Sequence, residues 1–179
     1  VMQLDESIFL FLFGLSHQAN LLDFIIVFVG VDESYLLIVI FLGLIFFKAT
    51  LWTKKFEIVL LAVSSIVLSR LLIVPFIRHF WPRLRPFIEY NITPLFTDYN
   101  ASFPSGHASF FFALSFIVYY YDKFWGKFFI ATSILITISR VMGGVHYLSD
   151  IIVGSIIGFL SAYLLYFYVW PKAKVNYRL

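Results

Sequence analysis

Two residues that could do chemistry stand one helical turn apart between two long apolar runs. His146 and Asp150 are four residues apart, and Arg140 and the pair Gly143-Gly144 precede them. On a shared helix, this spacing places the imidazole and the carboxylate on one face. The carboxylate could then hold the imidazole in one tautomer and leave the other nitrogen free to attack or to move a proton. The alternative is an aspartate that caps a helix beside a loop histidine.

A second group of polar residues opens another apolar run. Pro104-Ser105-Gly106-His107 leads directly into it, so we expect these residues at a helix N-terminus, where backbone N–H groups and the helix dipole attract anions. Gly106 lets the backbone approach an oxyanion closely, and the Ser105 hydroxyl adds a donor. His107 is placed to protonate a leaving oxygen. The alternative is a helix cap beside a surface histidine.

The composition places these residues in a membrane protein. The chain has 179 residues, of which 61% are hydrophobic and 13% are charged, whereas soluble domains are about half apolar and a quarter charged. We therefore expect an all-α integral membrane protein with a single domain, residues 1–179. The absence of cysteine excludes disulfides, thiolate metal sites and a cysteine nucleophile. Asp5 and Glu6 argue against a cleaved signal peptide at the beginning of this sequence.

The apolar runs predict which helices position the polar residues. Five runs are candidate membrane spans: Tyr35–Phe47, Ile58–Ile77, Gly106–Tyr121, Phe128–Met142 and Leu148–Trp170. They form a catalytic core over residues 35–170. Residues 1–33 contain two short apolar helices, which either lie in the membrane interface or form one kinked span. Prolines interrupt residues 78–104, so we expect a polar loop there.

The basic residues separate by type when the chain is threaded through these spans. One side receives every lysine and one arginine: Lys48, Lys54, Lys55, Lys123, Lys127, Lys172, Lys174 and Arg178. The other side receives four arginines, Arg78, Arg83, Arg85 and Arg140, with Arg70 inside a span. Positive residues mark the cytoplasmic side, so the second group faces outward. Arginine donates two parallel hydrogen bonds to phosphate, which favours an oxyanion site. The alternative for Arg70 and Arg83 is contact with lipid headgroups.

These residues together fit phosphoryl transfer through a phosphohistidine. His146 attacks phosphorus, Asp150 stabilises the imidazolium, and His107 protonates the leaving oxygen. The groups expected to bind the phosphate oxygens are Arg78, Arg85, Arg140, Ser105 and the Gly106 N–H. A zinc or iron site is the competing chemistry, but the arginines would repel a divalent cation, so we expect neither a metal nor another cofactor.

The three polar clusters resemble the type 2 phosphatidic acid phosphatase (PAP2) superfamily, whose motifs are K-x6-R-P, P-S-G-H and S-R-x5-H-x3-D. The second and third motifs match at every fixed position: Pro104-Ser105-Gly106-His107, and Ser139-Arg140 followed by His146 and Asp150. Arg85-Pro86 matches the first motif, but Arg78 replaces its lysine. The resemblance implies a bundle of five to six membrane helices, a metal-independent hydrolase and an active site at the outer face.

The resemblance favours a small bacterial enzyme of the inner membrane, with its site facing the periplasm and a lipid phosphate or pyrophosphate as substrate. Phosphatidylglycerophosphate, undecaprenyl pyrophosphate, phosphatidic acid and lipid A 1-phosphate all remain candidates. A lipid phosphotransferase would use the same residues, and a non-enzymatic anion-binding membrane protein is a further alternative. We expect the bilayer as partner, no nucleic acid and no obligate protein partner. In the 78–104 loop, Glu89 and Asp98 are expected to screen lipid headgroups.

Overall fold

The computed structural model describes residues 2–48 and 51–169. Within them, every regular element is helical: α1 Met2–Phe13, α2 Asn20–Val27, η1 Phe28–Asp32, α3 Glu33–Lys48, α4 Trp52–Ile66, η2 Val67–Ile73, α5 Val74–Phe80, α6 Pro86–Glu89, α7 Gly106–Tyr121, α8 Lys123–Met142, α9 Leu148–Leu164 and η3 Leu165–Val169. The η elements are π-helical. The predictions for Trp170, Lys172, Lys174 and Arg178 lie outside the described residues.

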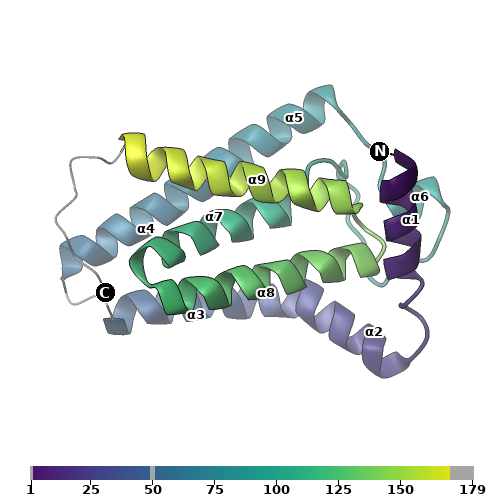
Figure 1. The fold of residues 1–179 in the computed structure, drawn as a ribbon, viewed down its shortest axis with the longest axis horizontal. Coiled ribbons are helices and arrows are strands. Elements are labelled where there is room, and N and C mark those ends of the chain that lie inside the picture. Colours follow the sequence, from purple (N-terminus) through teal and green to yellow (C-terminus); the bar gives the residue numbers. More distant parts are fainter. Residues whose placement is uncertain (1, 49–50, 170–179) are drawn as a thin grey trace.

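The long helices run side by side along one axis, and α1 lies across one end of them (Figure 1). Helix α7 packs against both α8 and α9. Its residues 113–118 are buried one after another, which requires neighbours on every side of the helix. The central helix is therefore the one that begins at Gly106, directly after the predicted anion-binding tetrapeptide.

Two glycines of α9 allow it to approach α7 closely. A Cβ atom on Gly154 would lie 2.4 Å from the carbonyl oxygen of Ser105, and one on Gly158 would lie 2.2 Å from that of Ser109. Both distances are far below van der Waals contact, so neither position has room for a side chain. Small residues commonly permit such backbone contact between membrane helices. This packing fixes the start of α7 against the first turns of α9.

The chain is a multi-pass membrane protein. In the described part of the chain, three helices are long and apolar enough to cross a bilayer: Trp52–Phe80, Lys123–Met142 and Leu148–Val169. A fourth candidate is the pair Asn20–Val31 and Tyr35–Lys48, which is bent by 47°. Helix α7 has 16 residues. At 1.5 Å per residue it is about 24 Å long, shorter than a hydrocarbon core of about 30 Å.

The prediction for residues 58–77 placed the end of that helix too early. The helix runs from Trp52 to Phe80 and passes through Pro75, which lies in the first turn of α5 directly after the π-helical η2. Proline lacks an N–H and crowds the preceding turn, and a π-helical turn is a common way to accommodate such a break. The extension carries Arg78 on a helix instead of in the predicted loop.

Other boundaries agree with the prediction or differ for local reasons. Helix α7 has the predicted bounds, and α9 begins at the predicted residue, Leu148. Helix α8 begins at Lys123 instead of Phe128, because the Asp122 carboxylate caps it by accepting from the N–H groups of Phe124 and Trp125, both at 3.0 Å. The N-terminal region forms two helices, α1 and α2, as predicted, although α1 begins earlier and includes Asp5.

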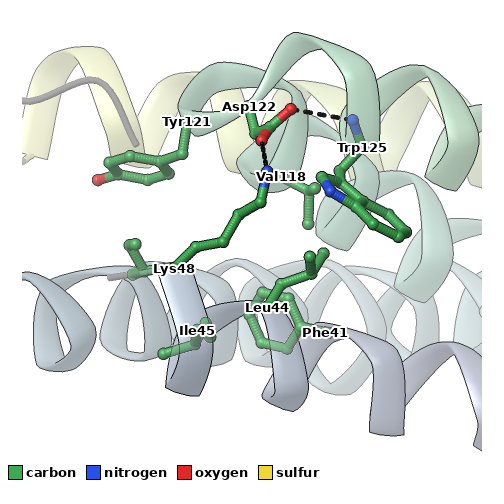
Figure 2. A pocket seen from close by; sticks show the side chains of 9 residues that line it. Phe41, Leu44, Ile45, Lys48, Val118, Tyr121, Asp122 and Trp125 are labelled. Atoms are coloured by element: carbon green, nitrogen blue, oxygen red, sulfur yellow. Dashed lines mark hydrogen bonds and ion pairs between the residues drawn. The ribbon is translucent and has the colours of Figure 1, made fainter. Parts of the chain in front are cut away.

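The described lysines gather at one end of the bundle. Lys48 at the end of α3 pairs with Asp122 in the α7–α8 turn at 2.6 Å, above a small apolar pocket (Figure 2). Lys54 and Glu57 form a second pair, at 3.4 Å, in the first turns of α4. We call this the lysine end. The opposite end, formed by α1, α6 and the segments 81–105 and 143–147, we call the site end.

Candidate active site

His146 lies at the site end, in the short link between α8 and α9. Gly143 and Gly144 form the turn after α8, and Gly144 has a φ of 86°, which favours glycine. The turn brings the chain back, and His146 is fully buried. Two residues later α9 begins, which places Asp150 in its first turn. The link thus delivers the imidazole to the interior beside a helix N-terminus.

Asp150 both caps α9 and contacts the histidine, so the two alternatives for this residue hold together. Its Oδ2 atom lies 3.4 Å from His146 Nδ1 and accepts the backbone N–H of Tyr147 at 2.9 Å. The Ser102 hydroxyl donates to the same oxygen at 2.5 Å and lies 3.3 Å from His146 Nδ1. A carboxylate held from several directions can keep the imidazole in one orientation.

The neighbour of the other imidazole nitrogen decides the tautomer. His146 Nε2 lies 3.2 Å from Arg85 Nη1. Arginine can only donate, so Nε2 must accept and carry a lone pair. The proton then resides on Nδ1 and is donated to Asp150. The nitrogen that faces the arginines is therefore the one able to act as a nucleophile.

The surroundings of His146 keep its imidazole neutral. Burial, with a smaller contribution from the charges of Arg85 and Arg140, lowers the pKa of His146 to about 4 against the opposing effect of Asp150. At neutral pH the Nε2 lone pair is consequently free of a proton. A neutral, oriented imidazole is what nucleophilic attack on phosphorus requires.

Arg85 and Arg140 are buried beside this nitrogen and share a carboxylate. Arg85 donates to the carbonyl oxygens of Asn100 at 2.7 Å and Val145 at 2.9 Å. Its Nη2 lies 2.7 Å from Asp98 Oδ2, and Arg140 Nη2 lies 3.9 Å from the same oxygen. Burial would raise the pKa of Asp98, but Arg85 and the Asn100 hydrogen bonds hold it below its ordinary value. Asp98 is thus an anion between two guanidinium groups.

The Asp98 carboxylate does not provide acceptors for all the N–H donors of Arg85 and Arg140. Although Arg85 Nη2 is close to Asp98, it is not aligned for a hydrogen bond, and Arg140 Nε is buried without an acceptor among the described residues. Buried donors without partners are costly and usually have a ligand or a functional reason. A tetrahedral phosphate has more oxygens, in more directions, than one carboxylate. The geometry therefore suits a larger oxyanion.

The remaining predicted residues line the same end. Arg78 donates to the carbonyl oxygen of Pro104, at 3.3 Å from Nε and 3.0 Å from Nη2. A Cβ atom on Gly106 would lie 2.2 Å from Arg70 Nη1, so glycine makes room for that guanidinium. The Ser105 hydroxyl caps α7 by accepting from Ala108 N at 3.4 Å, and the Ser105 N–H donates to the Asp150 carbonyl oxygen at 3.0 Å.

His107 lies in the first turn of α7, where its ring stacks on Phe111 with 6.5 Å between ring centroids. Its electrostatic neighbours are Arg140, Arg70 and His146. The eight predicted site residues therefore share one end of the bundle. Direct contacts join His146, Asp150 and Arg85, whereas Arg140 is linked to them through Asp98.

Four further residues lie in the site: Ser102 and Asp98 were not predicted to belong to it, and Arg70 and Arg83 were left open between an oxyanion site and lipid headgroups. Ser102 and Asp98 contact the residues above, and Arg70 reaches Gly106. Arg83 Nη1 lies 3.0 Å from Asp150 Oδ1, so the headgroup alternative for Arg83 is wrong. The expectation that Asp98 screens headgroups is also wrong, whereas the same expectation for Glu89, which is exposed, stays a prediction. Glu89 accepts from the Tyr147 hydroxyl at 2.7 Å and Asp98 pairs with Arg85. Proximity in sequence to Pro104 and Arg85 was the only available signal.

The site also bears on the metal alternative. Within residues 2–48 and 51–169, no group of three or more histidine, cysteine, aspartate or glutamate side chains could hold a metal ion. The donors around His146 are instead guanidinium groups, which bind anions. The geometry thus combines a buried imidazole, a carboxylate in contact with it and a set of cationic donors.

Comparison with known proteins identifies the class to which this site belongs. Residues 58–174 match the PAP2 superfamily, which is about two thirds of the chain. The chain therefore belongs to the PAP2 superfamily. The matched region includes all three motifs around Arg85, His107 and His146.

Particular relatives share nearly the full length of the chain. The bacitracin transport permease protein BcrC of Bacillus licheniformis is 28% identical over 185 residues, which covers 98% of this chain and 84% of the relative. Aquifex aeolicus LpxE has a similar structure, with a TM-score of 0.76, 24% identity and coverage of 92% of this chain and 96% of that one. A transmembrane PAP2-type phosphatidylglycerolphosphate phosphatase from Bacillus subtilis gives a TM-score of 0.68 at 21% identity, covering 98% and 89% of the two chains.

Proposed function

We propose that this protein is a metal-independent membrane phosphatase that hydrolyses a phosphomonoester or pyrophosphate on a lipid through a phosphohistidine. The observation that carries this proposal is the lone pair of His146 Nε2, which lies against Arg85 in a buried cluster of arginines. A nucleophile beside cationic donors is the arrangement that phosphoryl transfer uses, because catalysis there consists mainly of positioning and charge stabilisation.

The reaction would proceed in two steps. In the first, His146 Nε2 bonds to phosphorus while the bond from phosphorus to the leaving oxygen breaks, and His107 gives that oxygen a proton. Asp150 stabilises the positive charge on the imidazole. In the second, a water molecule gives a proton to His107 and attacks phosphorus, the P–N bond breaks, and inorganic phosphate leaves. Both histidines return to their starting states.

The phosphate oxygens would be bound by the cationic and polar groups at the start of α7 and around His146: Arg78, Arg85, Arg140, Ser105 and the Gly106 N–H. Arg140 Nε, which has no acceptor in the described part of the chain, is available for one of these oxygens. Asp98 occupies the neighbouring position and would have to move or share it. One well-aimed donor contributes about 3–4 kcal/mol to such a transition state.

The membrane arrangement supports a lipid substrate and a site that faces the periplasm. The lysine end would face the cytoplasm of a bacterial inner membrane, because positive residues near span ends are retained there. The site end would then face the periplasm, in a single domain with five membrane-crossing segments. A phosphate at headgroup depth is accessible from there, while acyl or prenyl chains stay in the bilayer. One similar structure is named a phosphatidylglycerolphosphate phosphatase, which supports a lipid phosphate.

The test is phosphate release from a panel of lipid phosphates by the purified protein in detergent and EDTA. The panel contains phosphatidylglycerophosphate, undecaprenyl pyrophosphate, phosphatidic acid and lipid A 1-phosphate. We expect at least one to be hydrolysed and His146→Ala to reduce kcat by roughly 1,000-fold or more. Full activity of His146→Ala would refute the phosphohistidine. Transfer of labelled phosphate to an added alcohol in preference to water would identify a transferase instead.

The pH dependence gives a second test. Protonation of Nε2 removes the nucleophile, and the pKa of His146 is lowered to about 4. Because the inactive form is the protonated one, a lowered pKa moves the loss of kcat/KM to more acidic pH. We expect kcat/KM to stay constant through pH 6 on the acid side and to fall only as the pH nears 4–5. A fall centred near pH 6.5, the value of an ordinary histidine, would contradict the buried neutral imidazole.

A further inference from the structure

The N-terminal helix α1 carries a carboxylate on its buried face. Asp5 is only 7% exposed and Phe9, one turn later, is fully buried. Phe9 packs edge-on against Tyr147, with 5.4 Å between ring centroids, which places this face of α1 over the start of α9. A buried carboxylate is costly unless it is paired and hydrogen-bonded. The partners of Asp5 therefore indicate what this face of α1 does.

Asp5 binds two groups that border the catalytic carboxylate. Its Oδ2 atom pairs with Arg83 Nη2 at 3.0 Å. Its two oxygens also accept from Ser149, at 3.0 Å from the backbone N–H and 2.5 Å from the hydroxyl. Ser149 directly precedes Asp150 in the chain. Asp5 thus holds the first turn of α9 and an arginine at the same time, from 144 residues away.

Arg83 completes the link, because its guanidinium joins two carboxylates. While Nη2 binds Asp5, Nη1 lies 3.0 Å from Asp150 Oδ1 and 2.8 Å from the Ser149 hydroxyl. The guanidinium lies 3.8 Å from the ring centroid of Tyr147, which restricts its plane. Because the guanidinium group is planar and its neighbours are fixed, each of its N–H groups points in one direction.

The two oxygens of Asp150 therefore have separate partners. Oδ1 receives Arg83, whereas Oδ2 receives His146 Nδ1, the Tyr147 N–H and the Ser102 hydroxyl. Rotation of the carboxylate about its last bond would exchange the two oxygens or twist Oδ2 away from the imidazole. Arg83 opposes that rotation, and its own position depends on Asp5.

We propose that Asp5 is a positioning residue of the active site, which acts through Arg83 to hold Asp150 Oδ2 against His146 Nδ1. Helix α1 then helps to orient the active-site residues and is not only an interfacial segment. This inference deepens the proposed function, since it concerns the orientation of the same nucleophile. Its tests include one measurement that needs no substrate.

The kinetic test compares two carboxylates of α1. Asp5→Asn keeps an oxygen for Ser149 but removes the charge that holds Arg83. We expect kcat to fall roughly tenfold and KM to change less than about twofold, because orientation and not substrate binding is affected. Glu6→Gln, the same chemical change at the next residue, should leave both values unchanged. An Asp5→Asn enzyme with the kcat of the parent protein, or one changed in KM alone, would overturn the inference.

A double variant separates positioning through Arg83 from a general role in folding. Arg83→Met alone should lower kcat by roughly 30-fold, since Asp150 Oδ1 loses its partner. Adding Asp5→Asn to Arg83→Met should then cause little further loss, because the residue through which Asp5 acts is gone. If the two losses multiply in full, Asp5 acts by another route and the inference is wrong.

The substrate-free test is an NMR titration of 15N-histidine-labelled protein in detergent, with His146→Gln to assign the signal. The ionisable groups that surround the His146–Asp150 pair come from several elements: Asp5 from α1, Arg83 and Arg85 from the loop after α5, Asp98 from the loop after α6, His107 from α7 and Arg140 from α8. Removing the negative charge of Asp5 should lower the pKa of His146, and Arg83→Met should raise it. Both shifts are expected to be roughly half a unit.

The titration also reports the tautomer. We expect the proton on Nδ1 in the parent protein, and an averaged signal from both tautomers in Asp5→Asn. Unchanged tautomer and pKa in Asp5→Asn would overturn the inference. If no lipid phosphate in the panel is hydrolysed but these shifts occur, the proposed function fails and the positioning role stands. If His146-dependent hydrolysis occurs but Asp5→Asn behaves like the parent protein, only the positioning role fails.

Discussion

The two ends of the bundle hold their basic residues in opposite ways. At the lysine end, Lys48 is 43% exposed and pairs directly with Asp122. Its neighbour Lys54 pairs with Glu57, which also accepts from the Tyr121 hydroxyl at 2.7 Å. At the site end, the side chains of Arg85 and Arg140 are 0% and 5% exposed. These arginines bind mainly backbone carbonyl oxygens and share one carboxylate.

The two ends differ in how many carboxylates accompany their basic residues. Each of the two lysine pairs has its own carboxylate, whereas Arg70, Arg78, Arg85 and Arg140 gather around Asp98. Burial of a cation without a full counter-charge is costly, so an excess of buried positive charge requires a separate explanation. A transient anionic ligand provides one. The lysine pairs join helices, whereas the excess of buried positive charge at the site end fits the proposed phosphate site.

The largest expected effect comes from exchanging one basic residue for the other type at the site end. Arg85→Lys keeps the charge but cannot reach Asn100 O, Val145 O and His146 together, so we expect kcat/KM for the lipid phosphate to fall roughly 100-fold. The reciprocal change at the other end, Lys55→Arg, is the matched control and should leave kcat/KM unchanged. Equal effects of the two exchanges would remove the distinction between the ends.

A smaller effect of the opposite sign is expected at Asp98. Its carboxylate competes with a bound anion for Arg85 and Arg140, so Asp98→Asn should strengthen inhibition by inorganic phosphate or orthovanadate roughly tenfold. The pKa of Asp98 is lower than usual, so the group is ionised throughout pH 5–8 and the difference should not vary with pH there. Asp23→Asn in α2 is the control. Unchanged or weaker inhibition in Asp98→Asn would show that Asp98 does not occupy the anion position.

The smallest effect is expected at the lysine end. Lys48→Met removes one partly exposed ion pair, which should change the free energy of unfolding by less than about 1 kcal/mol, and kcat/KM should stay the same. Thermal unfolding in detergent, followed by circular dichroism, and the phosphate-release assay measure the two quantities. A large loss of activity would mean that the two ends are coupled through the bundle.

Features set by local sequence could be predicted well. The start of α7 follows from Ser105 as cap after Pro104, and the turn between α8 and α9 follows from Gly143-Gly144. The separation of lysines from arginines could be obtained by threading alone. The path of the helix through Pro75 could not, because the π-helical turn before it depends on packing and leaves no local pattern.

Residues that enter the site through long-range contacts were the ones missed. The loops on either side of α6 are held by backbone bonds such as Ser102 N–H to Arg83 O at 2.9 Å and Leu95 N–H to Gly143 O at 3.1 Å. These bonds decide that Ser102 and Arg83 face Asp150. Nothing near Asp5 in the sequence points to a residue at position 149. Motifs thus identified the residues assigned to the reaction, whereas those that orient them required the fold.

The glycines of α9 also limit which substitutions the protein can tolerate. Any side chain at Gly154 or Gly158 would push α9 away from the backbone of α7, and Ser105 and Asp150 lie on the two sides of that contact. The start of α7 and the first turn of α9, which carries Asp150, are thereby tied into one rigid unit. Substitutions at α1 and residues 86–103, apart from the site contacts Asp5, Asp98 and Ser102, should therefore be tolerated better than any side chain at Gly154 or Gly158.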